Sequence, residues 1–86
     1  MFMPDAVIQM YGTTWCPDCI RAKQVLKKHN IAYDFHDIGE DKKALAYVEQ
    51  VNKGMRSVPV IVFPNGSVMV EPSTADLEQR LLEMTD

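Results

Sequence analysis

The sequence of 86 residues is poor in features that would point to several other classes of protein. It has only two cysteines, whereas a secreted domain of this size usually spreads several pairs along the chain as disulfide staples. No apolar run approaches the roughly 20 residues that span a bilayer. Residues 1–10 lack the basic and long apolar segments of a secretory signal peptide. These absences predict a cytoplasmic protein that does not associate with membranes.

Positive charge is also scarce. Nine lysines and arginines stand against twelve aspartates and glutamates, which gives a formal net charge of −3 at pH 7. Nucleic-acid binding usually needs a clustered basic surface, so we expect no nucleic-acid partner. Hydrophobic residues make up 47% of the chain, enough for residues 1–86 to fold as one small domain. We expect this domain to be a monomer.

Both cysteines lie in one short unit, Cys16-Pro17-Asp18-Cys19. A disulfide within it would close almost no loop, so it would constrain the unfolded chain little. Structural zinc needs four ligands, and only His29 and His36 could complete such a site, so zinc is disfavoured. The pattern favours a redox-active dithiol.

Hydrophobic periodicity predicts the order strand, helix, strand, helix, strand, strand, helix. The expected strands are residues 6–11, 31–36, 60–63 and 67–70, with the hairpin signal Asn65-Gly66 between the last two. Because residues 60–63 are apolar on both faces, we expect this strand to be central in the sheet. The expected helices run from Pro17 to about Lys28, from about Asp41 to Lys53, and from Ser73 onward.

The predicted helices have recognisable caps and apolar stripes. Asn30 can end the first helix and Gly54 the second, because both residues tolerate a left-handed backbone. Ser73 with Asp76 three residues later is typical of a helix start. The expected buried stripes are Cys19, Ala22, Val25 and Leu26, then Ala44, Leu45, Val48 and Val51, and finally Leu77, Leu81, Leu82 and Met84.

The first predicted helix gives the two cysteines different chemistry. Cys16 would lie at its N-terminus, where unpaired N–H groups and the helix dipole stabilise a thiolate. Cys19 would lie one turn deeper and would keep its proton longer. We therefore expect Cys16 to attack a disulfide and Cys19 to resolve the product. Asp18 opposes thiolate formation unless its carboxylate projects into water.

Ser57-Val58-Pro59 is the second informative segment. An X-Pro bond can be cis at modest cost, and proline donates no hydrogen bond to a strand ladder. If Pro59 is cis and faces Cys16, the backbone of Val58 is free to pair with an extended substrate or a small thiol. Trp15 is expected to contact substrate, whereas Tyr11 fits a core position and an active-site wall equally well.

These residues resemble the glutaredoxin family of the thioredoxin fold, and the resemblance covers nearly the whole chain. The positions in the family's order and approximate spacing are Tyr11, Cys16, Cys19, Asp37-Ile38, Val58-Pro59 and Asn65-Gly66. Only 15 residues precede Cys16, which favours a glutaredoxin over a thioredoxin proper. The resemblance implies an α/β fold, βαβαββα, with a four-stranded mixed sheet flanked by three helices.

Two departures from the family pattern point away from glutathione. Glutaredoxins that use it commonly have a lysine where this chain has Thr13, and a Gly-Gly pair where it has Glu71-Pro72. Residues 11–16, 51–59 and 72–73 look more like mycoredoxin-like glutaredoxins, which remove mycothiol from proteins. Within that likeness, Pro17-Asp18 differs from the usual pair between the cysteines.

The resemblance implies a thiol–disulfide oxidoreductase that reduces protein disulfides or mixed disulfides between proteins and a small thiol. Mycothiol, glutathione or bacillithiol would be the co-substrate, with no bound cofactor and no metal. Val58 would bind the small thiol through its backbone, while Arg56 and the Ser73-Thr74 helix start would receive its polar or anionic end. The implied binding residues are Tyr11, Thr13, Trp15, Pro17, Arg56, Val58, Pro59, Ser73 and Thr74.

Two alternative functions stay open. The protein could donate electrons to ribonucleotide reductase and be reduced directly by thioredoxin reductase. It could also be a non-catalytic carrier of an iron–sulfur cluster bridged between two chains, although Pro17 beside the first cysteine resembles the family members without a cluster.

Overall fold

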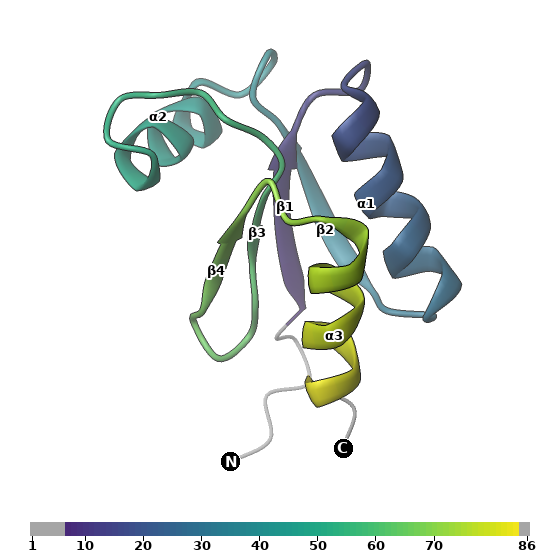
Figure 1. Ribbon diagram of the computed structural model, residues 1–86. Coiled ribbons are helices and arrows are strands. Elements are labelled where there is room, and N and C mark those ends of the chain that lie inside the picture. Colours follow the sequence, from purple (N-terminus) through teal and green to yellow (C-terminus); the bar gives the residue numbers. More distant parts are fainter. Residues whose placement is uncertain (1–6, 85–86) are drawn as a thin grey trace.

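The computed structural model describes residues 7–84, apart from the side chain of Met84, and shows the predicted order of elements (Figure 1). The strands are β1 (Ile8–Gly12), β2 (Tyr33–Asp37), β3 (Val60–Val62) and β4 (Val68–Val70). The helices are α1 (Pro17–Lys28), α2 (Lys42–Val51) and α3 (Thr74–Met84). Ala6, expected in the first strand, lies outside the described residues. Within residues 7–84, no helix is long and apolar enough to cross a membrane.

The four strands form one mixed sheet in the order β2-β1-β3-β4. β1 pairs in parallel with β2, which the crossover through α1 allows, and antiparallel with β3. β3 pairs antiparallel with β4 across the hairpin predicted at Asn65-Gly66. β3 is therefore an inner strand, as its apolar character on both faces predicted. α1 and α3 cover one face of the sheet, and α2 lies over the other (Figure 1).

The alternation of side chains along β1 divides the core into two layers. Tyr11 faces α2 and stacks on Tyr47 of that helix. Ile8 and Met10 face α1 and α3, where they are buried in one cluster with Cys19, Leu26, Ile61, Phe63, Leu77 and Leu81. Cys19 thus belongs to the larger apolar layer, and this location controls its chemistry.

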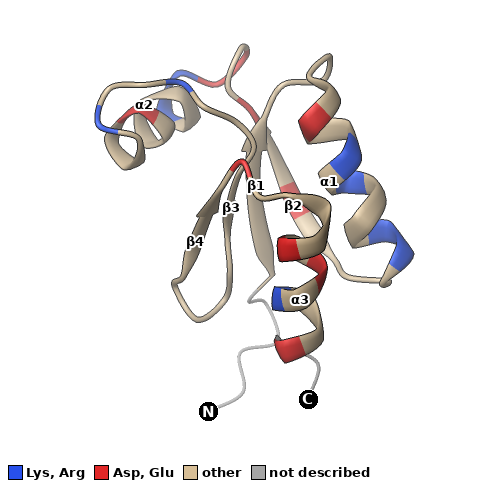
Figure 2. Ribbon diagram, viewed as in Figure 1, with Lys and Arg blue, Asp and Glu red and all other residues tan. Residues whose placement is uncertain are grey.

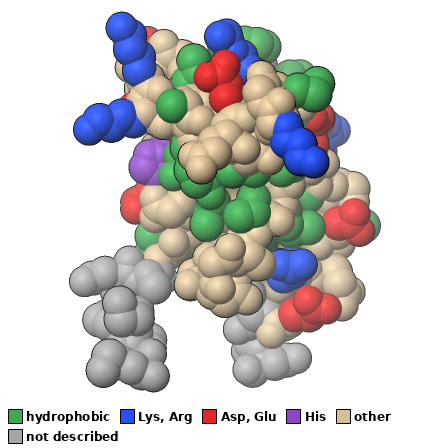
Figure 3. Space-filling view, turned by 90° about the vertical axis from the view of Figure 1, so that its left-hand side faces the viewer, with side chains coloured by type: hydrophobic (Ala, Val, Ile, Leu, Met, Phe, Trp, Pro, Cys, Tyr) green, Lys and Arg blue, Asp and Glu red, His purple; other side chains and the backbone are tan. Residues whose placement is uncertain are grey.

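The face that carries α2 is only partly covered. Seen from this side, apolar side chains remain visible below the charged residues around α2 (Figure 3). Val68 and Val70 of β4 are 39% and 40% exposed. They pair with Val62 and Val60 of β3. The apolar surface on the α2 side of the sheet therefore extends onto the edge strand β4, where none of the described helices covers it.

The predicted caps at the end of α1 and the start of α3 are confirmed. Asn30 has a φ of 56°, and the N–H of Ile31 donates to a carbonyl in the last turn of α1 over 3.0 Å. Because Ile31 completes this cap, β2 begins at Tyr33 rather than at residue 31. At α3, the N–H of Asp76 donates to Ser73 Oγ over 3.1 Å.

The end of α2 differs from the prediction. The helix begins as expected, with the Asp41 side chain accepting from two N–H groups of its first turn, but it ends at Val51 rather than at Lys53. Lys53 itself takes the first left-handed position, with a φ of 56°. Gly54 follows with a φ of 95°, and its N–H donates to the carbonyl of Glu49. Two consecutive left-handed residues thus form the cap, where the sequence predicted one glycine.

The predicted stripe of α3 was right for Leu77 and Leu81, which are both 1% exposed. It was wrong for Leu82, which is 54% exposed. Leu82 lies about 100° around the helix from Leu81, on the side that faces away from the core. The side chain of Met84 lies outside the described part of the chain.

A polar contact joins α1 to α3 on the surface of their shared layer. Figure 2 shows basic residues along α1 and acidic residues along the adjacent α3. Lys28 Nζ donates to Glu78 Oε2 over 3.1 Å, and His29 Nε2 lies 3.1 Å from the same oxygen. The hydrogen bonds from His29 and then Lys28 lower the pKa of Glu78.

We expect Glu78→Gln to destabilise the fold at neutral pH and to lose this effect in acid. Because the folded-state pKa is lowered, the ionised carboxylate stabilises the fold above its ordinary pKa of 4.5, and this contribution disappears as the pH falls through the lowered value. Urea unfolding of both proteins, from neutral to acidic pH, measures the gap in stability. Glu83→Gln is the control, since Glu83 contacts residues of its own helix, Arg80 over 3.7 Å and Gln79 over 3.4 Å. A gap that stays constant with pH would contradict this account of Glu78.

Candidate redox site

Cys16 is the N-cap residue of α1, and Pro17 is the first residue of the helix. Proline costs the helix no hydrogen bond at this position, because an N–H in the first turn would have no partner within the helix. The side chain of Cys16 makes no capping hydrogen bond and is partly exposed. An N-cap side chain lies near the free N–H groups of the first turn, where the helix dipole favours negative charge. The sulfur is therefore accessible and lies at the positive end of the helix dipole.

The acidic residue between the cysteines is ion-paired. Asp18 Oδ1 accepts from the Arg21 guanidinium on the next turn of α1, and both side chains are exposed. The carboxylate is thus solvated and has a counter-charge. Under these conditions its repulsion of a nearby thiolate is weak.

Cys19 lies one turn deeper, and none of its surface is exposed. Burial raises the pKa of Cys19 to about 11, while a hydrogen bond from the Thr13 N–H lowers it and the Cys16 thiol raises it. The thiol form of Cys19 therefore predominates at neutral pH. Both cysteines are free thiols here. The structure therefore separates an accessible sulfur from a buried, protonated one.

Gly12, the last residue of β1, makes room for the Cys19 sulfur. A Cβ atom on Gly12 would lie 2.5 Å from Cys19 Sγ, much closer than such atoms approach. The sulfur therefore occupies the space that any other residue at position 12 would fill. This close approach determines how deeply the first turn of α1 lies against the sheet.

We expect Gly12→Ala to destabilise the protein by about 1–3 kcal/mol, the usual cost of overpacking a core. In a Cys19→Ala background the same change should cost much less, because the sulfur that the new methyl group meets is absent. Urea unfolding of the parent, both single variants and the double variant measures this coupling. An equal cost of Gly12→Ala in both backgrounds would show that Gly12 is needed for another reason.

A pocket of about 290 Å³ lies beside the loop that leads to Cys16. It brings together four of the predicted binding residues, which are Thr13, Trp15, Arg56 and Val58. The Val58–Pro59 bond is cis, as the hypothesis for this segment required. Pro59 itself is buried, and its carbonyl accepts from the N–H of Glu71 over 2.8 Å.

The pocket offers few polar groups. Thr13 is 8% exposed, and its buried Oγ1 has no hydrogen-bond partner within residues 7–84. Among the described residues that line the pocket, Arg56 alone is a cation, and its Nε lies 3.2 Å from Glu49 Oε2. Trp15 is 78% exposed, so its ring is not packed against the sheet. The lining therefore combines apolar surface with a single, partly compensated positive charge.

Five of the predicted binding residues do not line this pocket, namely Pro17, Pro59, Tyr11, Ser73 and Thr74. Tyr11 is partly buried and stacked between His36 and Tyr47, with ring centroids 4.7 Å away on both sides. Burial and the neighbouring Tyr47 raise its pKa. Ser73 and Thr74 line a separate hollow of about 350 Å³. That hollow also contains the carboxylates of Asp18 and Glu71, so it is not the pocket that Arg56 lines.

Sequence reasoning missed three residues of the pocket, which are Ile38, Gly39 and Leu45. Ile38 and Gly39 follow β2, and the N–H of Ile38 donates to the Gly12 carbonyl over 2.9 Å. The carboxyl ends of parallel strands meet at one edge of a sheet, and ligands often bind there. The predicted strand–helix–strand order at the start of the chain, which is typical of a parallel pair, was thus a signal for Ile38 and Gly39.

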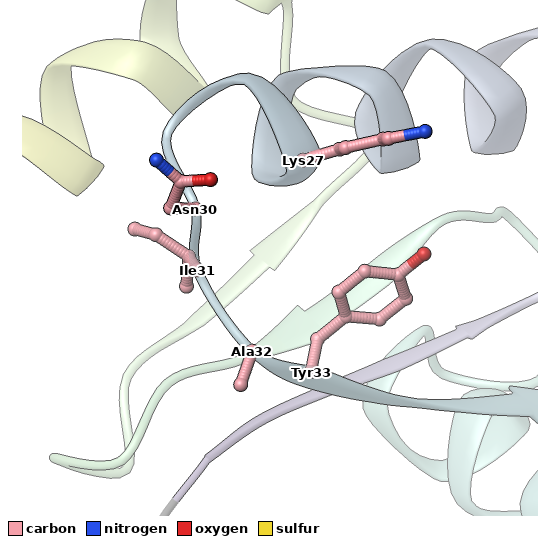
Figure 4. Close-up of a pocket in the computed structure, with 5 residues that line it drawn as sticks. All are labelled: Lys27, Asn30, Ile31, Ala32 and Tyr33. Carbon is pink, nitrogen blue, oxygen red and sulfur yellow. The ribbon is translucent and has the colours of Figure 1, made fainter.

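A larger hollow of about 490 Å³ lies at the opposite end of α1, between the helix and the start of β2 (Figure 4). Its lining consists of Lys27, Asn30, Ile31, Ala32 and Tyr33. The length of the helix separates it from Cys16, so it takes no part in the dithiol site.

A four-stranded mixed sheet, three helices and a dithiol at the start of α1 define a protein of the thioredoxin-like class. The sequence pattern of the family described as Glutaredoxin matches residues 8–69. The chain belongs to the glutaredoxin family, as its motifs predicted.

The chain is similar to several relatives in sequence. A Mycobacterium tuberculosis protein named for this family is 37% identical over 82 residues, which are 95% of this chain and 98% of the relative. Mycoredoxin 1 of Corynebacterium glutamicum is 31% identical over 70 residues, 81% of this chain and 86% of the relative. Glutaredoxin of Pseudomonas aeruginosa is 45% identical over 60 residues, which are 69% of this chain and 67% of the relative.

Solved structures have the same fold. A variant of the thioredoxin-like protein BC3987 superposes with a TM-score of 0.74 at 30% identity, over 86% of this chain and 97% of the other. Glutaredoxin grx-1 of Archaeoglobus fulgidus gives a TM-score of 0.67 at 27% identity, over 95% of this chain and 88% of the other.

Proposed function

We propose that the protein is a thiol–disulfide oxidoreductase that reduces mixed disulfides between proteins and a small thiol, as its resemblance to mycoredoxins suggests. The observation that carries this proposal is the contrast between accessible Cys16 and fully buried Cys19. We place the reaction in the cytoplasm, where cysteines are kept reduced. The chain would act as a monomer without a bound cofactor.

In the proposed reaction, the Cys16 thiolate attacks the small-thiol sulfur of the mixed disulfide. A bond forms between Cys16 Sγ and that sulfur, the original S–S bond breaks, and the protein substrate leaves as a thiolate that takes up a proton. A second molecule of the small thiol, as its thiolate, then attacks the sulfur now bound to Cys16. This step releases the oxidised small thiol and restores the Cys16 thiolate.

The burial of Cys19 supports this route over intramolecular resolution. Attack on the Cys16 mixed disulfide requires a thiolate, and the pKa of Cys19 near 11 makes that form scarce at neutral pH. A free small thiol that binds in the adjacent pocket is not buried in the core, so burial does not make its thiolate form scarce. Cys19 then serves as a slower, second resolving group, which also gives the protein a way to reduce protein disulfides.

The charge of the pocket bears on which thiol it binds. Glutathione carries two carboxylates, but the lining supplies only Arg56, which Glu49 partly neutralises. Thr13 occupies the position where glutathione-dependent relatives commonly have a lysine. A hydroxyl-rich thiol without carboxylates, such as mycothiol, needs fewer cations. We therefore propose mycothiol as the preferred co-substrate over glutathione or bacillithiol.

We expect Cys16→Ser to abolish turnover of a protein–small-thiol mixed disulfide, whereas Cys19→Ser should keep a substantial part of it. The assay follows NADPH oxidation with the small thiol and its reductase. Activity of the Cys19→Ser protein measures the route in which only Cys16 is needed. Equal loss in both variants would contradict this route. Reduction of the oxidised protein by thioredoxin reductase, with no small thiol present, would favour the ribonucleotide reductase alternative.

We expect Arg56→Gln to raise KM for the small thiol by about two- to fivefold with little change in kcat, because an exposed charged contact contributes up to about 1 kcal/mol to binding. Lys53→Gln is the matched control, since Lys53 is an exposed cation nearby in the chain that does not line the pocket. Steady-state assays with mycothiol, glutathione and bacillithiol, each with its own reductase, measure KM and preference. A KM unchanged by Arg56→Gln would place the binding site outside this pocket.

A further inference from the structure

Lys23 differs from the other basic residues of α1. Lys27 and Lys28 are exposed, whereas Lys23 is partly buried. Its Nζ lies 3.6 Å from the centroid of the Phe35 ring on β2, well within the range of a cation–π interaction. An aromatic ring thus holds the ammonium group against the protein instead of leaving it in solvent.

The ring that holds Lys23 lies close to the buried thiol. Phe35 packs against the core cluster that contains Cys19. Its Cε1 is 3.5 Å from the position that a Gly12 Cβ would occupy, and Cys19 Sγ is 2.5 Å from the same position. Lys23 also follows Cys19 by one turn of α1, so both side chains lie on the same side of the helix.

The electrostatic surroundings of Cys19 include a cation. The thiol of Cys16 and the ammonium of Lys23 both act on Cys19. Lys23 lowers the pKa of Cys19 against the larger effect of burial. A positive charge acts more strongly across a partly buried path than through water, and the contact with Phe35 restricts the flexible lysine chain.

We propose that Lys23, held on the Phe35 ring, is a positioning residue that stabilises the Cys19 thiolate as its sulfur attacks Cys16. This inference rests on the proposed function and deepens it by assigning a residue to the resolving step. In that step a bond forms between Cys19 Sγ and Cys16 Sγ, and the bond between Cys16 and the bound thiol breaks. The bound thiol leaves with the electron pair, and the proton of Cys19 passes to solvent.

The two steps can be timed separately with 5,5′-dithiobis(2-nitrobenzoate) as the disulfide. Attack by Cys16 releases one coloured thiolate, and attack by Cys19 on the resulting mixed disulfide releases the second. We expect Lys23→Gln to slow the second release about threefold at neutral pH and to leave the first unchanged. Loss of the ammonium charge raises the pKa of Cys19, which makes the thiolate scarcer but also more nucleophilic, so the rate falls by less than the thiolate population does.

Further variants distinguish charge from packing. Lys23→Arg keeps a cation on the ring and should restore the second release, and Phe35→Leu should slow it as Lys23→Gln does. Lys27→Gln, an exposed change on the next turn, should alter neither step. The gap between parent and Lys23→Gln should narrow as the pH is raised toward the pKa of Cys19, because both proteins then become thiolates. Urea unfolding verifies that each variant is folded.

Two results would overturn the inference: an unchanged second release in Lys23→Gln, or equal slowing of both releases. The assay needs neither a small thiol nor a protein substrate. A parent protein that shows both releases but no turnover of mixed disulfides would therefore overturn the proposed function alone. The rate of the second release alone would then decide the role of Lys23.

Discussion

The approach of the Cys19 sulfur to the end of β1 is the constraint on which the rest of the site depends. Because Gly12 has no side chain, the first turn of α1 can lie close enough to the sheet for the sulfur to enter the apolar core. Cys16, one turn earlier, is then at the rim of the same layer and partly exposed. The two cysteines therefore differ in accessibility and reactivity because Cys19 lies one helical turn deeper than Cys16.

The parallel pairing of β1 and β2 assembles the remainder of the site from distant parts of the chain. Both strands end at the same edge, where the Ile38 N–H donates to the Gly12 carbonyl. The loop before Cys16, the loop after β2 and the segment before β3 therefore surround one pocket. Phe35 and Gly12 lie near this edge as well, so the same part of the sheet supports both the pocket and the buried thiol of Cys19.

Much of this could be predicted from the sequence because the decisive signals are local. Periodicity indicated every strand and helix, and the cysteine motif indicated the reactive helix end. Contacts that depend on packing depth were less predictable. The exposure of Leu82, the left-handed Lys53 and the separation of Ser73 from Arg56 follow from how elements dock. The Lys23–Phe35 contact joins α1 to β2, and no spacing within either element indicates it.

Trp15 gives the protein a built-in optical probe. It is the only tryptophan of the chain, it directly precedes Cys16, and its indole is largely in solvent. Sulfur groups quench indole emission to different degrees as thiols, thiolates and disulfides. The oxidation state of the site can therefore be followed in unlabelled protein by fluorescence, while the Tyr11 stack beneath α2 provides a separate near-ultraviolet signal for the opposite layer.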